Sequence, residues 1–230
     1  MSAPGNISVL LLPGMDGTGE LLTALVDQLS LLRSAQIISF PANRPLGYDD
    51  LIAFVAERTP KGRFAILGES FSGPIAIEIA ATESRVAGLI LASSFARHPI
   101  PSLFAPLANV LDLRWMPTKL VEAALLGSTG TPELKDRLSK LLARLPREII
   151  RTRASEVLRV DKRNRLRQIT CPILCLHGRF DRLVGRQCLE EITLAQPRCQ
   201  VQWFDASHML LETHTDAAAE AISEFCQRLS

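Results

Sequence analysis

Six short runs rich in isoleucine, valine and leucine recur along the chain, and this recurrence restricts its fold more than any other feature. The runs span residues 7–12, 36–40, 63–67, 86–92, 172–177 and 200–204. Each has the length and composition of a buried strand, and stretches with helical periodicity separate them. Because strands and helices alternate, we predict an α/β fold: a mostly parallel sheet of about six strands with helices on both faces.

The alternation is interrupted once, over residues 95–171, where the pattern is helical throughout. Thr131, Pro132 and Glu133 have the order of a helix start, with a capping hydroxyl, a proline in the first turn and an early acid. We therefore predict a core formed by residues 1–94 and 172–230, and a helical lid formed by residues 95–171. At 230 residues, the chain suits one domain with such an insertion.

Composition excludes several classes of function. A net charge of +2 is too small to predict nucleic-acid binding. The five cysteines are an odd number without CxxC or zinc-type spacing, so we expect free thiols in a reducing compartment and no metal site. The N-terminus lacks a basic segment, and its apolar run is too short for a signal sequence or a membrane span. We expect a cytoplasmic protein that needs no cofactor.

Residues 68–73 read Gly-Glu-Ser-Phe-Ser-Gly, between a predicted strand and a predicted helix. At such a corner the hydroxyl of Ser70 would project above the sheet as a nucleophile. The backbone N–H of the next residue, Phe71, would lie at a helix N-terminus, where negative charge is stabilised. The common pattern is G-x-S-x-G, and Ser72 replaces its second glycine. Taken alone, the segment also fits a serine-rich turn that caps a helix.

Two further residues follow predicted strands in the order that a hydrolytic triad needs. Asp181 comes just after the fifth strand and His208 just after the sixth. His208 would take the proton of Ser70, and Asp181 would orient the imidazole ring. Asp205 is the alternative acid, but its own loop would have to fold back. The other histidines, His98, His177 and His214, do not have the required position in the chain.

The first strand is followed by the glycine-rich sequence PGMDGTG at residues 13–19. We expect the backbone N–H of Met15 to join that of Phe71 in an oxyanion hole. A nucleotide-binding loop is the competing interpretation. The run is neither GxGxxG nor a P-loop with its lysine, so we discount that interpretation.

Together, PGMDGTG, GESFSG, HGRFD and ASH resemble the corresponding segments of the α/β-hydrolase superfamily, over nearly the whole chain. The resemblance implies an α/β-hydrolase fold without the N-terminal hairpin that many members have, and a serine carboxylesterase activity. The lid and the stretch before Asp181 are similar to small carboxylesterases. That group includes the methyl esterase that acts on pimeloyl-acyl carrier protein in biotin biosynthesis, whose elbow has the usual glycine where this chain has Ser72.

The lid supplies candidate residues for binding an acyl substrate and a partner. Phe104, Leu107, Trp115 and Met116 would line an acyl pocket, although the same pattern would pack a lid on its core. Nine basic residues between Arg144 and Arg167 would form an exposed flank. Arg147, Arg151 and Arg159 are our candidates within it for binding an acidic acyl carrier protein. A solvated helix face is the alternative.

Three other activities remain open at this point. A thioesterase and an acyl transferase would share the acyl-enzyme with an esterase and differ in the nucleophile that resolves it. A non-catalytic ligand-binding protein could use the same fold, because fold alone does not determine function.

Overall fold

The computed structural model describes residues 7–30, 34–99 and 118–229, with side chains omitted for 118–121. These residues form one six-stranded sheet in the order β2-β1-β3-β4-β5-β6, and every neighbouring pair of strands is parallel. The strands are β1 (Ser8–Leu12), β2 (Ala35–Ile37), β3 (Phe64–Glu69), β4 (Val86–Ala92), β5 (Ile173–Gly178) and β6 (Gln200–Phe204). The predicted fold class is confirmed.

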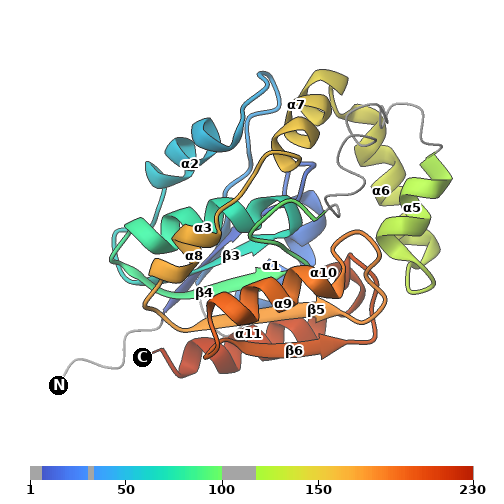
Figure 1. Cartoon of the computed structure of the whole chain (residues 1–230). Helices are drawn as coiled ribbons and strands as arrows, with labels where there is room; N and C mark the ends of the chain where they lie inside the picture. Colours follow the sequence, from blue (N-terminus) through green and yellow to red (C-terminus); the bar gives the residue numbers. More distant parts are fainter. Residues whose placement is uncertain (1–6, 31–33, 100–117, 230) are drawn as a thin grey trace.

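Helices cover both faces of the sheet (Figure 1). On one face α1 (Thr23–Ser30), α10 (Leu210–Thr213) and α11 (Thr215–Gln227) contribute to one buried apolar cluster. On the other face α2 (Tyr48–Ala56), α3 (Gly73–Thr82), α8 (Arg163–Gln168) and α9 (Arg186–Ala195) contribute to a second. β3 and β4 are buried at every position, and apart from Glu69 at the end of β3 they are continuous apolar runs rather than alternating ones.

Between β4 and β5 the described residues form helices α5 (Thr118–Leu126), α6 (Pro132–Arg144), α7 (Arg147–Val157) and α8. Helix α6 begins as predicted, because the Thr131 side chain accepts a hydrogen bond from the backbone N–H of Leu134 at 3.2 Å. Helices α5 and α6 lie beyond the end of the sheet to which the strands point (Figure 1), and they share an apolar cluster with Leu21 and Met209.

We predicted the second strand at residues 36–40. In the structure this strand, β2, is Ala35–Ile37, so it begins one residue earlier and ends three residues earlier than predicted. After Ile37 the chain leaves the edge of the sheet. The N–H of Ile38 still donates to the oxygen of Leu11, but the N–H of Phe40 donates to the oxygen of Gly17, in the loop after β1. Ile38 and Phe40 are buried in this loop, and their apolar character caused the misplacement.

The topology brings the loops of interest to one place. The chain moves from β1 to the edge strand β2 and then returns to the other side of β1 with β3. The strand order therefore changes direction between β1 and β3, and in open α/β sheets ligands bind at the carboxyl ends of the strands at such a point. Two 3₁₀ turns lie at this point, η1 (Glu20–Leu22) and η2 (Ser70–Ser72).

Candidate active site

Ser70 lies at the sharp turn from β3 into helix α3, with a backbone φ of 48°. A non-glycine residue with positive φ is strained, and such strain is common where a side chain must be held at an exposed corner. The turn is possible because its flanking glycines leave room. A Cβ on Gly68 would lie 2.7 Å from the Ser72 oxygen, and one on Gly73 would lie 1.7 Å from Oγ of Ser94. That Ser94 hydroxyl donates to the Ser70 carbonyl oxygen at 2.6 Å.

Ser72, the departure from the G-x-S-x-G pattern, is fully buried and its hydroxyl donates to the backbone oxygen of Pro13. Pro13 lies in the loop after β1, so the extra hydroxyl joins the turn after β3 to that loop. The alternative interpretation of this segment was a turn whose serines cap a helix. No side-chain cap is present at Ser72, since its hydroxyl is directed to the neighbouring loop instead.

The structure brings Ser70, His208 and Asp181 together in one hydrogen-bonded chain. Nε2 of His208 lies 2.8 Å from Oγ of Ser70, and Nδ1 of the same ring lies 2.8 Å from Oδ2 of Asp181. Ser70 follows β3, Asp181 follows β5 and His208 follows β6, as we expected from the sequence. With Asp181 accepting from Nδ1–H, Nε2 is left unprotonated and able to accept the hydroxyl proton.

Asp181 is held as an anion. Its side chain is fully buried, and its Oδ1 accepts from the backbone N–H groups of Leu183 and Val184 at 2.9 Å each. Burial by itself raises the pKa of Asp181, but the charge of His208 and the hydrogen bonds from His208, Val184 and Leu183 outweigh it, and the pKa lies below its usual value. The rival acid, Asp205, is exposed and pairs with Arg179 at 3.0 Å.

His177, another of the four histidines, is the next-to-last residue of β5 and is buried with its ring edge-on to Trp203. Burial lowers the pKa of His177 and therefore favours its neutral form.

Hydrogen bonds fix successive peptide units of the loop at residues 13–17. The N–H of Gly14 donates to Oε2 of Glu69 at 3.0 Å, and the N–H of Gly17 donates to the Gly14 oxygen at 3.0 Å. The Met15 oxygen accepts from Nη1 of Arg153 at 2.7 Å. These bonds use the groups on both sides of the Met15 N–H, and they fix its direction.

Phe71, the residue after Ser70, is also held on several sides. Its ring stacks on Tyr48 with centroids 4.7 Å apart, and its carbonyl oxygen accepts from the Tyr48 hydroxyl at 3.0 Å. The guanidinium of Arg153 lies 6.0 Å from the centre of the Phe71 ring. Both residues that we expect to donate N–H groups to an oxyanion are therefore rigidly supported.

Arg153 corrects one sequence prediction. We expected an exposed basic flank between Arg144 and Arg167, but Arg153 is only 1% exposed. Its Nη1 donates to the backbone oxygens of Met15 and Asp16, at 2.7 and 2.8 Å. Gly17 has a φ of 74° and packs so closely that a Cβ there would lie 2.3 Å from the same nitrogen. Nothing in a run of arginines indicates that one of them is buried and donates hydrogen bonds to a loop that is distant in the sequence.

The other candidate partner residues, Arg147, Arg151 and Arg159, are exposed on or just after α7. The candidate acyl-pocket residues Phe104, Leu107, Trp115 and Met116 lie outside the described residues.

Sequence reasoning missed a pair of acidic side chains next to Ser70. The carboxyl groups of Glu69 and Glu212 face one another, and both Glu69 and Oε2 of Glu212 are buried. Burial raises the pKa of Glu69 well above its usual value, with Glu212 and Asp16 adding to the effect, and burial raises the pKa of Glu212 to about 7. Two carboxylates in contact cannot both be ionised in a buried site, so the pair holds a proton near neutral pH.

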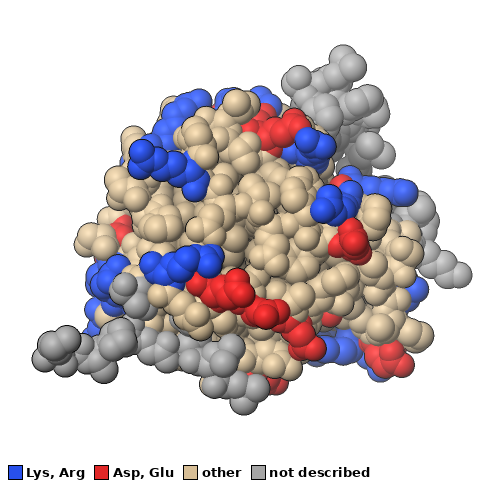
Figure 2. All heavy atoms as spheres, turned by 90° about the horizontal axis from the view of Figure 1, so that it is seen from below, with Lys and Arg blue, Asp and Glu red and all other residues tan. Residues whose placement is uncertain are grey.

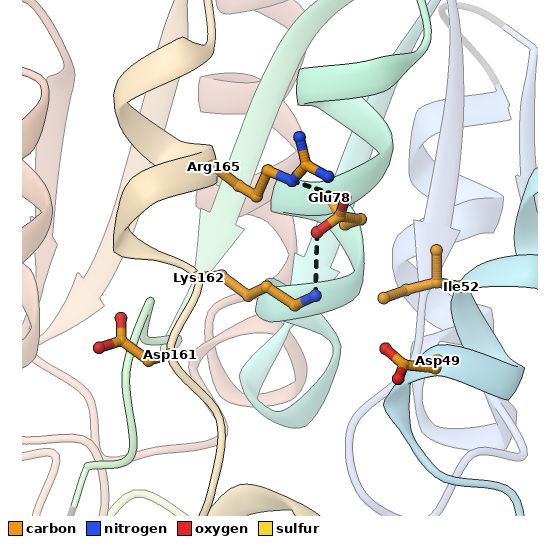
Figure 3. A pocket seen from close by; sticks show the side chains of 6 residues that line it. All are labelled: Asp49, Ile52, Glu78, Asp161, Lys162 and Arg165. Atoms are coloured by element: carbon orange, nitrogen blue, oxygen red, sulfur yellow. Dashed lines mark hydrogen bonds and ion pairs between the residues drawn. The ribbon is translucent and has the colours of Figure 1, made fainter.

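A pocket of about 380 Å³ lies elsewhere, between α2, α3 and α8. Figure 3 shows Glu78 of α3 at its centre, approached from α8 and the residue before it by Arg165 and Lys162, each 2.9 Å away. Ile52 and Asp49 form the α2 side. Because both cations are already paired with Glu78, this cluster attaches α8 to α3, and it contains none of the residues around Ser70.

The described residues contain no group of three or more His, Cys, Asp or Glu side chains that could hold a metal ion. In the same part of the chain, every helix is too short or too polar to cross a membrane. On the face shown in Figure 2, basic and acidic side chains lie close to one another among uncharged surface, in keeping with the small net charge.

Comparison with known proteins agrees with the fold. No curated protein sequence matches the chain. Among solved structures, the enol-lactonase from Burkholderia xenovorans LB400 is similar with a TM-score of 0.83 and 16% identity, over 99% of this chain and 94% of that one. An esterase from Exiguobacterium antarcticum has a TM-score of 0.84 and 16% identity, with 96% and 92% covered.

A thermophilic esterase from Thermogutta terrifontis has a TM-score of 0.78 and 22% identity, with 97% of this chain and 90% of the esterase covered. At these identities the likeness concerns the fold. The sequence model of the alpha/beta hydrolase family matches residues 9–221, nearly the full length of the chain. The protein therefore belongs to the alpha/beta hydrolase family.

Proposed function

We propose that the protein is a serine hydrolase that cleaves carboxylic esters through an acyl-enzyme intermediate. The observation that carries the proposal is the chain of two 2.8 Å contacts from Ser70 through His208 to Asp181. An esterase and a lactonase among the similar structures support ester-bond chemistry, since a lactone is a cyclic ester.

In the first half of the reaction, Oγ of Ser70 attacks the ester carbonyl carbon while Nε2 of His208 takes the hydroxyl proton. The carbonyl oxygen becomes an oxyanion and accepts hydrogen bonds from the backbone N–H groups of Met15 and Phe71. Each such donor contributes on the order of 3 kcal/mol of transition-state stabilisation. The C–O bond then breaks, and the alcohol leaves with the proton from His208.

In the second half, His208 removes a proton from water as the water oxygen attacks the acyl carbon. The second tetrahedral intermediate collapses to the free acid, and the proton returns to Oγ of Ser70. Asp181 stabilises the imidazolium in both halves through Nδ1. Every proton and bond is accounted for by these three side chains and water, so the reaction requires no cofactor.

The experiment that tests this proposal is the initial rate on p-nitrophenyl esters of short to medium acyl length, for the native protein and Ser70→Ala. Ser223→Ala is a matched control, because Ser223 is a buried serine of α11 and is not one of the three triad residues. We expect turnover by the native protein and the control and none by Ser70→Ala. Equal rates for all three would contradict a Ser70 nucleophile. Tight ligand binding without turnover by the native protein would favour the non-catalytic alternative.

We further propose that residues 95–171 act as a lid and that exposed arginines on it bind an acyl carrier protein that presents a methyl ester. The support is that Arg147, Arg151 and Arg159 are exposed, on α7 or just after it. The same helix contacts the loop at residues 13–17 through Arg153. The test compares a methyl ester linked to carrier protein with the free methyl ester. We expect Arg151→Glu and added salt to slow only the carrier-linked substrate. Equal effects on both substrates would contradict the carrier hypothesis.

A thioesterase or an acyl transferase would use the same acyl-enzyme. Supplying matched oxygen esters and thioesters, with and without an alcohol acceptor, separates the three activities. Faster ester than thioester cleavage, with the free acid as the product, is the result we expect.

A further inference from the structure

One peptide unit in the loop after β1 is held at both of its polar ends by Glu69, the residue before Ser70, and Ser72, two residues after it. The carbonyl oxygen of Pro13 and the N–H of Gly14 belong to the same planar peptide group. Ser72 donates its hydroxyl to that oxygen, and Glu69 accepts from that N–H through Oε2 at 3.0 Å. Ser72 and Glu69 are both buried, so water does not compete for these hydrogen bonds.

The next peptide group contains the Met15 N–H, and its direction follows from this arrangement. Its carbonyl oxygen, that of Gly14, accepts from the Gly17 N–H at 3.0 Å. In a trans peptide the N–H points opposite to the carbonyl oxygen. With the preceding peptide held by Glu69 and Ser72, the Met15 N–H cannot rotate without breaking buried hydrogen bonds.

We propose that Glu69 and Ser72 are positioning residues that fix the peptide unit at residues 13–14, and through it the Met15 N–H, for stabilising the oxyanion. This inference rests on the proposed function and deepens it. It also gives a role to the serine that departs from the G-x-S-x-G pattern: the hydroxyl adds a hydrogen bond to the loop that a glycine there could not make.

The proposed positioning role also requires Glu69 to be uncharged. An ionised Glu69 would place a negative charge beside the loop that must stabilise a second one, and the two would repel. The groups that face Glu69 are Glu212 of α10, Asp16 of the loop after β1 and His208 of the loop after β6. Glu212 also faces Arg137 of α6.

Glu212 makes the neutral form of Glu69 the favourable one. Its Oε2 is buried and meets no N–H or hydroxyl donor within the described part of the chain. A proton on Glu69 lets that carboxyl donate to Glu212 while Oε2 of Glu69 still accepts from Gly14. Burial raises the pKa of Glu69 well above its usual value, which is consistent with this arrangement.

Ser72→Ala tests the carbonyl side of the peptide. We expect kcat on a p-nitrophenyl ester to fall by about tenfold with KM unchanged, the effect of losing one hydrogen bond that matters in the transition state. Ser223→Ala, which removes another buried hydroxyl, should leave kcat unchanged. A Ser72→Ala rate equal to that of the native protein, or a change in KM alone, would overturn the role of Ser72.

Glu69→Ala and Glu69→Gln together test the other side. The glutamine amide can accept from the Gly14 N–H and donate to Glu212, as a protonated carboxyl does. We expect Glu69→Ala to lower kcat by about tenfold and Glu69→Gln to restore it near pH 7. If glutamine and alanine lower kcat equally, the proposed contact does not act on the reaction.

The dependence of kcat on pH is a further test, because a purely structural role of Glu69 would not change it. For the native protein, we expect kcat to decline as the pH rises and Glu69 loses its proton. Glu69→Gln cannot ionise at this position and should lack that decline. An identical alkaline decline in both proteins would overturn the requirement for a neutral Glu69, and this comparison remains decisive if Glu69→Ala does not fold.

A fluorophosphonate probe separates failure of this inference from failure of the proposed function. The probe forms a bond between its phosphorus and Oγ of an activated serine, with fluoride leaving. We expect the native protein and the Ser72, Ser223 and Glu69 variants to be labelled on Ser70 at the end point, with slower labelling of Ser72→Ala and Glu69→Ala. Absence of Ser70 labelling in the native protein would refute the proposed function. Full labelling with unchanged rates in the variants would refute only the positioning role.

Discussion

Nη1 of Arg153, on helix α7, donates to the backbone oxygen of Met15 at 2.7 Å. This contact connects the helical segment between β4 and β5 to the loop after β1. Replacing Arg153 with alanine would remove the donor from the part-buried oxygens of Met15 and Asp16. We expect the free energy of unfolding to fall by about 3 kcal/mol, because two acceptors lose a charged donor and the packing of a buried side chain is lost.

Urea unfolding of Arg153→Ala measures this effect. Arg151→Ala is the matched control, because Arg151 is on the same helix and exposed. Its free energy of unfolding should stay within about 0.5 kcal/mol of the native value. Equal stability of both variants would show that the buried guanidinium does not hold the loop.

Asp181 and Asp205 give a second prediction, since both follow strands near His208. Asp181→Asn keeps the shape of the side chain but favours the wrong tautomer of His208, so kcat should fall by about 10³ to 10⁴. Asp205→Asn should leave kcat unchanged, because Asp205 is exposed and pairs with Arg179. Ester hydrolysis by the two purified variants decides between the carboxylates, and a larger loss in Asp205→Asn would reverse the assignment.

Gly68 gives a third prediction. An added Cβ would lie 2.7 Å from the Ser72 oxygen and 2.8 Å from the Cβ of Ala76, both closer than normal contact. We expect Gly68→Ala to lower the free energy of unfolding by about 1–3 kcal/mol, as overpacking does in other cores. Gly62→Ala is the control, since nothing lies within 4 Å of a Cβ there. Thermal unfolding of the pair checks the prediction, which would be wrong if both variants melted together.

The pair formed by Glu69 and Glu212 predicts how stability depends on pH. The pKa of Glu212 is raised from 4.5 to about 7 in the folded protein. Between pH 4.5 and about pH 7, Glu212 holds a proton in the folded state that it has released in the unfolded state. Stability must therefore decrease as pH rises through this window, by up to about 1.4 kcal/mol per pH unit for one proton.

Glu212→Gln, which cannot titrate at this position, should reduce that slope, and Glu69, whose pKa burial also raises, should account for the slope that remains. Urea unfolding at several pH values between 4.5 and 7 makes the comparison. A slope of the same size in the native protein and the variant would mean that Glu212 does not hold a proton on folding.

The centre of the sheet was predictable because β3, β4 and β5 are buried at every position. A buried parallel strand is a short continuous apolar run, and β4 has the predicted bounds. The edge strand β6 also has the predicted bounds, but we predicted a buried strand and most of its residues are exposed. The edge strand β2 was misplaced since Ile38 and Phe40 are apolar for another reason, namely burial in a loop. An apolar residue indicates burial but not the backbone conformation in which it is buried.

The positions of Ser70, Asp181 and His208 also followed from local signals, because each comes directly after a strand of a parallel sheet. The residues that support them gave no such signal. Ser72, Glu69 and Arg153 act on the loop at residues 13–17, which is distant from them in the sequence. A polar residue whose partner lies on another part of the chain looks the same in a sequence as one that faces water.

The strained backbone of Ser70 lowers the stability of the folded protein. Its φ of 48° costs of the order of 1–3 kcal/mol in a non-glycine residue, whereas glycine adopts this conformation freely. Ser70→Gly should therefore give a protein that withstands more heat and urea than the native one and hydrolyses nothing. Glycine at this position would favour stability, whereas the proposed reaction requires the serine hydroxyl, so stability and the proposed activity make opposite demands on residue 70.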